Sequence, residues 1–526
     1  MSEHHGGAAA ELGSSKGVVA GILAILVLYG VAAAMQWPQT GTAMTNGMHA
    51  DHLVDAPGTG AKEHAEHFDS GHEHGAAAAH PDYFMVLPFC LLLGAIAVFP
   101  LSHKTEHFWE SNRNKFLVAG GLGLLTLAYY AFAYQHPLDR HFLGHKVVAP
   151  DSATALPWVI IQNAIFNDFV PFIVLLFALY TICGGIRISG DLPAHPSTNT
   201  AFLAVGGLLA SLIGTTGAAM LLIRPVLETN SERKHVAHTV VFFIFIICNC
   251  GGCLLPIGDP PLFLGYLQGV DFLWTLGLWK QWAFVNAALL AIYFLGDTLV
   301  AYPRETKRDI QRDETRVRGL QFGGLMPNVP LLMGVVLAAA LLSPTKPFPG
   351  TDWYPWLYLR EAVQLGLVAI SLAFGSSKVR SDNGFNYGAI LEVAALFIGI
   401  FICMQPALQI LDVKGSELPV KSAAQYFWAT GSLSSVLDNA PTYLVFYEMA
   451  KINPAELTAE MAELLAAISL GAVFMGANTY IGNGPNFMVK TIAEKAGVKM
   501  PSFFGYMVYS FSVLIPLFVL VTYMFF

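Results

Sequence analysis

Two short stretches of this chain decide how it folds. Residues 257–263 read IGDPPLF and residues 481–487 read IGNGPNF, and each interrupts a long apolar segment. Glycine and proline break helices, so each segment should form two half-helices joined by an unwound stretch. The first stretch carries Asp259, and the second carries Asn483 at the matching position.

The two breaks belong to an internal repeat with a constant offset of 224 residues. At the same offset the tetrapeptide 214–217 (GTTG) matches 438–441 (DNAP), and Asp168 matches Glu392. The first copy begins at the fourth apolar span of the chain and the second copy at the ninth. An odd number of membrane crossings, five, separates the two starting points, so the two copies enter the membrane from opposite sides. Inverted repeats with matching helix breaks are the best sequence indication of a transporter's binding site.

The composition places the chain in a membrane. Of its 526 residues 55% are hydrophobic and only 12% are charged, and the mean hydropathy is +0.54. Soluble proteins carry about 25% charged residues, so we expect the lipid bilayer as the main partner. The net charge of −8 argues against nucleic acid as a partner. The six cysteines lie in apolar segments and do not form a disulfide framework.

Apolar runs long enough to cross a bilayer recur along the chain. We count eleven, at 17–36, 84–101, 115–134, 158–183, 236–268, 282–300, 325–343, 360–375, 386–411, 461–490 and 502–525. Two further apolar stretches, 199–227 and 422–450, are broken in the middle by polar residues, which is typical of re-entrant hairpins. The expected fold is therefore an all-α polytopic membrane protein with about eleven transmembrane helices and two re-entrant hairpins.

This pattern divides the chain into four parts. Residues 1–83 hold an N-terminal helix and a histidine-rich outer loop, for which we favour a solvated tether over weak metal binding or pH sensing. Residues 84–300 hold the first repeat, with hairpin 199–227 and broken helix 236–268. Residues 301–320 form a basic linker, and residues 321–526 hold the second repeat, with hairpin 422–450 and broken helix 461–490.

The basic linker gives the orientation. Residues 301–320 contain six Lys and Arg residues, which the positive-inside rule places in the cytoplasm. Counting back places the N-terminus in the cytoplasm as well, provided that the apolar run 17–36 is a retained helix. We favour a retained helix over a cleaved signal peptide, because the run is long for a signal and Lys16 is its only nearby positive charge.

The candidate ion site consists of the oxygen-bearing side chains at the hairpin tips and the helix breaks. These are Thr215, Thr216, Asp259, Asp438, Asn439, Thr442, Asn478, Thr479 and Asn483. Oxygen ligands suit hard cations, and carboxylates inside a membrane are candidates for function by default. Capping of a helix end is the alternative for Asp259 and Asp438. Asp168 and Glu392 are equally open to ion binding and to supporting a neighbouring hairpin.

The two carboxylates suggest a mechanism. A buried carboxylate is easily neutralised by a proton or by a metal cation, but it does not hold both at full strength. That competition is the minimal mechanism of cation/proton exchange, with sodium bound at Asp438, Asn439 and Asp259. No resident cofactor is expected, and sodium and protons are the transported species. The chain lacks the H-E-x-x-H signature of a metalloprotease, so we do not expect an enzyme.

Three cysteines precede the first break, at positions 248, 250 and 253. Small side chains pack well between membrane helices, so we favour a packing role over binding of a soft metal or arsenite.

The tips 214–217 (GTTG) and 437–442 (LDNAPT), together with 258–261 (GDPP), resemble the ion transporter superfamily. Within it the chain is similar to the NhaD-type sodium/proton antiporters over roughly residues 84–526. The resemblance implies a homodimer with a static scaffold and a transport domain that carries ions by an elevator-like motion. It also implies sodium or lithium export in exchange for protons across a bacterial inner membrane.

Relatives in the same superfamily carry citrate or dicarboxylates with sodium, and others export arsenite, so both functions remain alternatives. The sodium-coupled carboxylate carriers bear a Ser-Asn-Thr triplet at both tips. Neither tip has that triplet here, and the second has Asp438-Asn439 instead. This departure favours the antiporter branch.

Overall fold

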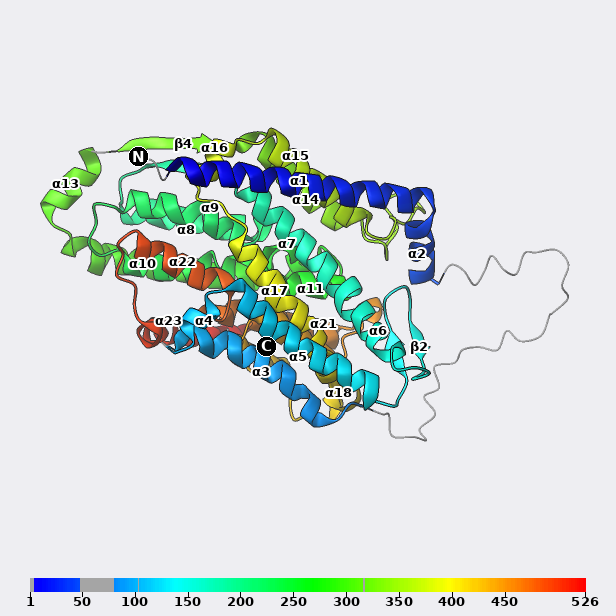
Figure 1. The fold of residues 1–526 in the computed structure, drawn as a ribbon. Helices are drawn as coiled ribbons and strands as arrows, with labels where there is room; N and C mark the ends of the chain where they lie inside the picture. Colours follow the sequence, from blue (N-terminus) through cyan, green and yellow to red (C-terminus); the bar gives the residue numbers. More distant parts are fainter. Residues whose placement is uncertain (1–3, 48–79, 103, 316) are drawn as a thin grey trace, which may run out of the picture.

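The computed structural model describes residues 4–47, 80–102, 104–315 and 317–526, and this part of the chain is mostly helical (Figure 1). Two small antiparallel ribbons are the only sheets within these ranges. β1 (Leu138–Arg140) pairs with β2 (Lys146–Val148), and β3 (Arg187–Asp191) pairs with β4 (Arg318–Gly323). The outer loop expected from the sequence holds seven histidines, at positions 49, 52, 64, 67, 72, 74 and 80, and the first six lie outside the described residues. His80 is described, just before the first helix of the main bundle.

The chain runs through the helices in the following order. The N-terminal part holds α1 (His4–Ala34), α2 (Trp37–Thr45), α3 (Leu87–Val98), α4 (Glu106–Trp109) and α5 (Asn112–Phe132). There follow α6 (Ala155–Ile161), a π-helical stretch (Gln162–Phe169), α7 (Val170–Cys183), α8 (Pro196–Ile213), α9 (Thr215–Thr229), α10 (Ala237–Ile246), α11 (Pro260–Leu267) and α12 (Trp279–Gly296). The linker holds α13 (Lys307–Thr315).

The second half begins after β4. It holds α14 (Leu325–Leu341), α15 (Leu359–Phe374), α16 (Ser377–Asp382), α17 (Gly388–Cys403), α18 (Gln405–Lys414), α19 (Ala423–Ser434), α20 (Asn439–Met449), α21 (Ala459–Met475), α22 (Gly484–Lys495) and α23 (Phe503–Phe525). At the offset of 224 residues, α9 matches α20, α11 matches α22, and α12 matches α23. The first residue of each helix falls on the first residue of its counterpart.

The fold is that of a multi-pass membrane protein, as the composition predicts. Within the described ranges seven helices are long and apolar enough to cross a bilayer, or eight if the bent pair Gly388–Cys403 and Gln405–Lys414 is one span. One of the seven, α8, belongs to the hairpin expected at 199–227, so fewer of the eleven expected spans form a single long helix. The reason is that several predicted segments form shorter or broken helices, including Tyr83–Val98, Ala237–Cys253 and Leu325–Leu341.

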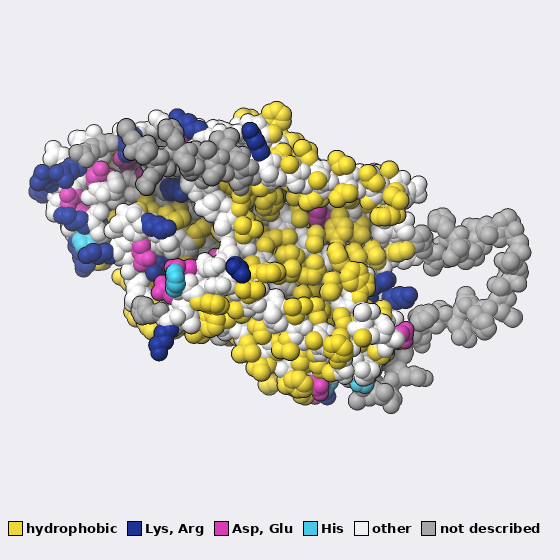
Figure 2. All heavy atoms as spheres, viewed as in Figure 1, with side chains coloured by type: hydrophobic (Ala, Val, Ile, Leu, Met, Phe, Trp, Pro, Cys, Tyr) yellow, Lys and Arg dark blue, Asp and Glu magenta, His cyan; other side chains and the backbone are white. Residues whose placement is uncertain are grey.

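The distribution of apolar and charged side chains on the surface is that expected of a membrane protein. Figure 2 shows hydrophobic side chains covering the middle of the molecule, over the region where Figure 1 places α1, α5 and α17. Many Lys and Arg side chains gather at the end that carries α13 and β4. Large exposed apolar patches are rare on soluble monomers, so the apolar middle faces lipid and the charged ends face water.

Each predicted hairpin is a pair of packed helices with a break at the expected tip. α8 and α9 lie against each other and are joined by Gly214, whose φ of +82° is a backbone conformation that glycine adopts readily. α19 and α20 also pack together, and they are joined by residues 435–438. Asp438 caps α20, because its carboxylate accepts the Ala440 N–H at 3.1 Å.

The two broken helices also form as expected. α10 ends at Ile246 and α11 begins at Pro260, so the chain between them has only short turns of 3₁₀-helix. In the second repeat α21 ends at Met475 and α22 begins at Gly484. Proline fits the first turn of a helix, where its missing N–H has no helical partner, and Pro260 and Pro485 both lie there.

Candidate ion site

Asp259 is the centre of the site. Its side chain is 1% exposed and accepts three hydrogen bonds from residues that come from both repeats. Oδ1 accepts the Thr215 hydroxyl at 2.9 Å and the Asn483 amide at 3.1 Å, and Oδ2 accepts the Asn439 amide at 2.6 Å. The sequence places these residues at four separate helix breaks, and the fold brings all four breaks to one carboxylate.

The four residues are two symmetry-related pairs. Asp259 and Asn483 lie 224 positions apart and precede the first residues of α11 and α22. Thr215 and Asn439 have the same separation and are the first residues of α9 and α20. Four helix N-termini therefore meet at this point. The partial positive charge of a helix N-terminus stabilises a negative group such as the Asp259 carboxylate.

Two serines that our sequence reasoning missed hold the breaks in place. The Ser211 hydroxyl donates to the Gly251 carbonyl at 2.6 Å and accepts the Leu254 N–H at 3.0 Å. In the second repeat the Ser435 hydroxyl lies 3.1 Å from the Met475 carbonyl and 2.9 Å from the Asn478 amide. Ser211 and Ser435 are themselves repeat partners, so a search for identical residues at the constant offset would have found them.

The second break supplies further oxygen atoms. Thr479 donates its hydroxyl to the Ser435 carbonyl at 2.5 Å, and Asn478 donates its amide to the Ser435 hydroxyl. The side-chain oxygens of Asn439 and Asn478 are buried without a hydrogen-bond partner within the described ranges. Buried polar atoms are almost always satisfied, so these two oxygens are available as ligands for a cation.

Asn249 is another residue that sequence reasoning missed. It is fully buried, its amide donates to the Asn486 side chain at 2.8 Å, and its oxygen lies 3.3 Å from the Asn483 amide. Asn486 in turn donates to the carbonyls of Gly476 and Thr479, both at 2.9 Å. These amide hydrogen bonds hold the second break against the first. Asn249 lies ten residues before Asp259 in the sequence, so only the fold shows that it contacts the second break.

Three predicted site residues lie less centrally. Asp438 is half-buried at the second tip, where one carboxylate oxygen caps α20. The Thr442 hydroxyl donates to the Asp438 carbonyl at 3.0 Å, which is a bond within its own helix. Thr216 is partly exposed and lines the pocket described below.

Asp168 and Glu392 have partners other than Asp259. Asp168 is 5% exposed in the π-helical stretch before α7, and it accepts the Asn167 amide at 2.9 Å. Glu392, on α17, forms an ion pair with Lys115 of α5, with 2.6 Å between Oε1 and Nζ. In the described part of the chain neither carboxylate hydrogen-bonds a hairpin tip, so the fold gives both of them a position outside the immediate surroundings of Asp259.

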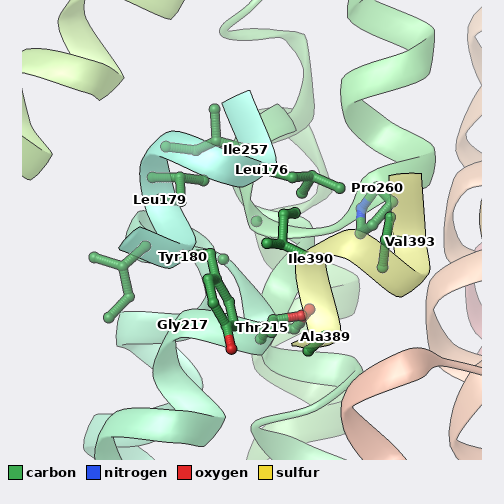
Figure 3. A pocket seen from close by; sticks show the side chains of 14 residues that line it. Leu176, Leu179, Tyr180, Thr215, Gly217, Ile257, Pro260, Ala389, Ile390 and Val393 are labelled. Atoms are coloured by element: carbon green, nitrogen blue, oxygen red, sulfur yellow. The ribbon is translucent and has the colours of Figure 1, made fainter. Parts of the chain in front are cut away.

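A cavity of about 80 Å³ opens beside the first tip (Figure 3). It is lined by Thr215, Thr216 and Pro260 and by residues of α7 and α17, including Tyr180 and Ile390. Parts of the fourth and ninth predicted spans therefore line a cavity next to the first tip. The cavity has the volume of a few water molecules, since one water needs about 10–15 Å³ by the same measure, but its lining is mostly apolar and does not include Asp259.

Helix N-termini, rather than basic side chains, provide the positive charge around Asp259 in the described part of the chain. Lys, Arg and His are absent from the described residues that line the cavity, and Asp259 has no salt-bridge partner in the same part of the chain. The cysteines at 248, 250 and 253 are fully buried, and they do not form a group of three close metal ligands within the described ranges. Their thiols pack in the interior, and the Cys248 carbonyl accepts the Asn483 amide at 3.0 Å.

The fold and this site define a membrane transporter with discontinuous helices. A family model described as "Putative citrate transport" matches residues 78–526, and the chain belongs to that family. The match covers both repeats, and membership of this family makes the protein a secondary transporter of the ion transporter type. No curated protein sequence matches the chain.

Proposed function

We propose that the protein exchanges sodium or lithium for protons, with Asp259 as the shared site of the cation and the proton. The observation that carries this proposal is a buried carboxylate surrounded by neutral groups from both repeats, without a cationic partner in the described part of the chain. An unpaired buried charge is unfavourable. In each state of the cycle Asp259 therefore takes up either a proton or a metal cation.

The oxygen atoms nearby complete the coordination. The carboxylate of Asp259 supplies the charge, and the unpaired oxygen of Asn439, whose amide contacts Asp259, supplies a neutral ligand, with the unpaired oxygen of Asn478 at the second break as a further candidate. Asp438 adds a second carboxylate at the tip of the second hairpin. Hard oxygen ligands of this kind suit alkali cations rather than soft metals.

The mechanism that we propose is an elevator-like movement of the site residues as one body. The hairpins and the broken helices are linked by hydrogen bonds across the repeats, such as Asn439 to Asp259 and Asn249 to Asn486. α7 and α17 contact the cavity from outside this group. A body held together in this way can move past α7 and α17 without losing its ligands, and a homodimer would supply the fixed support.

A cation-coupled citrate carrier is the second candidate, and two observations favour it. The family description refers to citrate. The four helix N-termini of α9, α11, α20 and α22 meet at the site, and such N-termini attract anions. In this reading sodium binds at Asp259 and the citrate carboxylates bind at the helix ends.

One experiment separates the two candidates. Everted membrane vesicles with an imposed proton gradient receive sodium, lithium, potassium or citrate while a dye reports the internal pH. We expect sodium or lithium to dissipate the gradient in the wild type and in Asp151→Asn, a matched change at an exposed aspartate, but not in Asp259→Asn. Sodium-dependent uptake of labelled citrate without cation-driven proton movement would overturn the exchange proposal in favour of the second candidate.

A further inference from the structure

Three carboxylates from distant parts of the sequence meet at the end of the molecule that carries the basic linker (Figure 1). Asp191 ends strand β3, Glu232 lies just after α9, and Asp313 lies on α13 of the linker. Each offers a carboxylate oxygen, and these oxygens all lie within 4.8 Å of one another. The cluster is separate from Asp259, because its residues belong to the loops between the apolar helices.

The two aspartates are buried and only partly satisfied. Asp191 is 2% exposed and Asp313 is 3% exposed, and one oxygen of each, Oδ1, has no hydrogen-bond partner among the described residues. The other oxygen of Asp313 accepts the Ala194 N–H at 2.7 Å. Because buried carboxylate oxygens without partners are costly, the pair of orphaned oxygens indicates a missing ligand that donates positive charge.

An irregularity in strand β3 orients the side chain of Asp191 toward the other two carboxylates. The pairing of β3 with β4 is irregular between Ser189 and Asp191, and Gly190 between them has a φ of +118°. A Cβ at Gly190 would lie 2.6 Å from the Gly319 carbonyl oxygen, so the local geometry requires glycine. Bulges of this kind redirect a side chain from one face of a strand to another.

Three basic groups lie around the cluster, and of these Arg318 is close enough to Asp191 to lower the pKa of that carboxyl. Arg233 is buried in an ion pair with Asp297 at 2.5 Å, and Glu305 lies 3.7 Å away. Arg318, the β4 residue paired with Asp191, is exposed and forms no ion pair within the described ranges. The ring of His195, which faces Asp313, lies 3.0 Å from the Tyr302 hydroxyl.

The acidic groups outnumber these cations. Glu228 at the end of α9 adds a fourth carboxylate, and its Oε2 lies 3.4 Å from the Gly190 N–H. Burial, followed by the neighbouring Glu232 and Asp313, raises the pKa of Asp191 to about 6. The local charge is therefore negative, and a divalent cation would offset it.

We propose that Asp191, Glu232 and Asp313 bind a divalent cation with hard oxygen chemistry, such as Mg²⁺, Mn²⁺ or Ca²⁺. Carboxylate oxygens are the ligands that these ions prefer, and water molecules complete their coordination. The bound ion ties the linker helix α13 to strand β3 and to the base of α9, whose other end carries Thr215. The site does not depend on which species the transporter carries.

The test measures Mn²⁺ binding to the purified full-length protein in sodium-free potassium buffer by electron paramagnetic resonance. We expect at least a tenfold loss of affinity in Asp313→Asn and in Glu232→Gln. The second variant changes a partly exposed side chain, so it remains informative if the first fails to fold. Glu314→Gln, an exposed neighbour on the same helix, and Asp259→Asn should both bind Mn²⁺ as the wild type does.

A second measurement tests whether the bound ion holds the linker helix α13 in place. Trypsin cleaves after Lys307, Arg308 and Arg312 of the linker, and Mn²⁺ or Mg²⁺ should slow this cleavage in the wild type but not in Glu232→Gln. Absence of Mn²⁺ binding in the wild type, or binding that survives both Asp313→Asn and Glu232→Gln, overturns the proposal. Binding that is lost only in Asp259→Asn assigns the ion to the transport site and also overturns it.

Discussion

Asp259 and Asn483 occupy the same position in the two repeats and are hydrogen-bonded to each other, with 3.1 Å between Oδ1 and Nδ2. Both precede the first residue of a helix, and their backbone angles are nearly the same, at φ −143° and −152°. The two repeats therefore meet at one contact between a charged residue and its neutral counterpart. The backbones of the two repeats are therefore symmetric at this contact, but the side chains are not, because only Asp259 carries a carboxylate.

The contact between Asp259 and Asn483 predicts what happens when the two residues are exchanged. Asp259→Asn should abolish cation-driven proton movement, because the site loses its charge. The double variant Asp259→Asn/Asn483→Asp restores one carboxylate at the symmetric position, within the same group of helix N-termini. We expect partial recovery of sodium-dependent exchange in the vesicle assay. Full inactivity of a well-folded double variant would show that the position of the carboxylate matters as well as its presence.

Asn439 and Thr442 should differ although both lie at the second tip. The Asn439 amide donates to Asp259, whereas the Thr442 hydroxyl donates within its own helix. A hydrogen bond to a charged group contributes about 1.5–3 kcal/mol, so Asn439→Ala should weaken sodium activation about tenfold or more. Thr442→Val should change it less than about threefold. The concentration of sodium for half-maximal exchange measures both, and equal effects would contradict the assigned geometry.

Gly258 should not tolerate a side chain, whereas Gly484 should. A Cβ at Gly258 would overlap the carbonyl oxygen of Gly252, and no atom outside its chain neighbours lies within 4 Å of a Cβ at Gly484. Overpacking of this kind costs about 1–3 kcal/mol or more. We expect Gly258→Ala to lower the melting temperature in detergent and to reduce exchange. Gly484→Ala is the matched control and should behave as the wild type.

Glu392 should act through stability rather than through ion binding. It pairs with Lys115, whose side chain is only 6% exposed, while its own is 43% exposed. Glu392→Gln leaves the buried lysine without its partner and should cost about 1–3 kcal/mol of stability. The double variant Lys115→Met/Glu392→Gln should recover the melting temperature. Loss of exchange in Glu392→Gln with an unchanged melting temperature would instead place Glu392 in the transport cycle.

The sequence by itself determined the features that depend on a few neighbouring residues. Glycine and proline break helices locally, so the breaks before Pro260 and Gly484 and the tip at Gly214 were predictable. The low charge content predicted a membrane protein, and the offset of 224 residues predicted the matching of α9 with α20. The number of long spans was overestimated, because apolar composition does not show where a helix is short or broken.

The tertiary structure alone decided which of these residues meet. Thr215, Asn439 and Asn483 share one carboxylate only because the two hairpins and the two broken helices pack against each other. The same applies to Asp191 and Asp313, which lie more than a hundred residues apart and meet through the pairing of β3 with β4. Contacts of this kind depend on the packing of whole helices and strands, and local backbone preferences do not determine them.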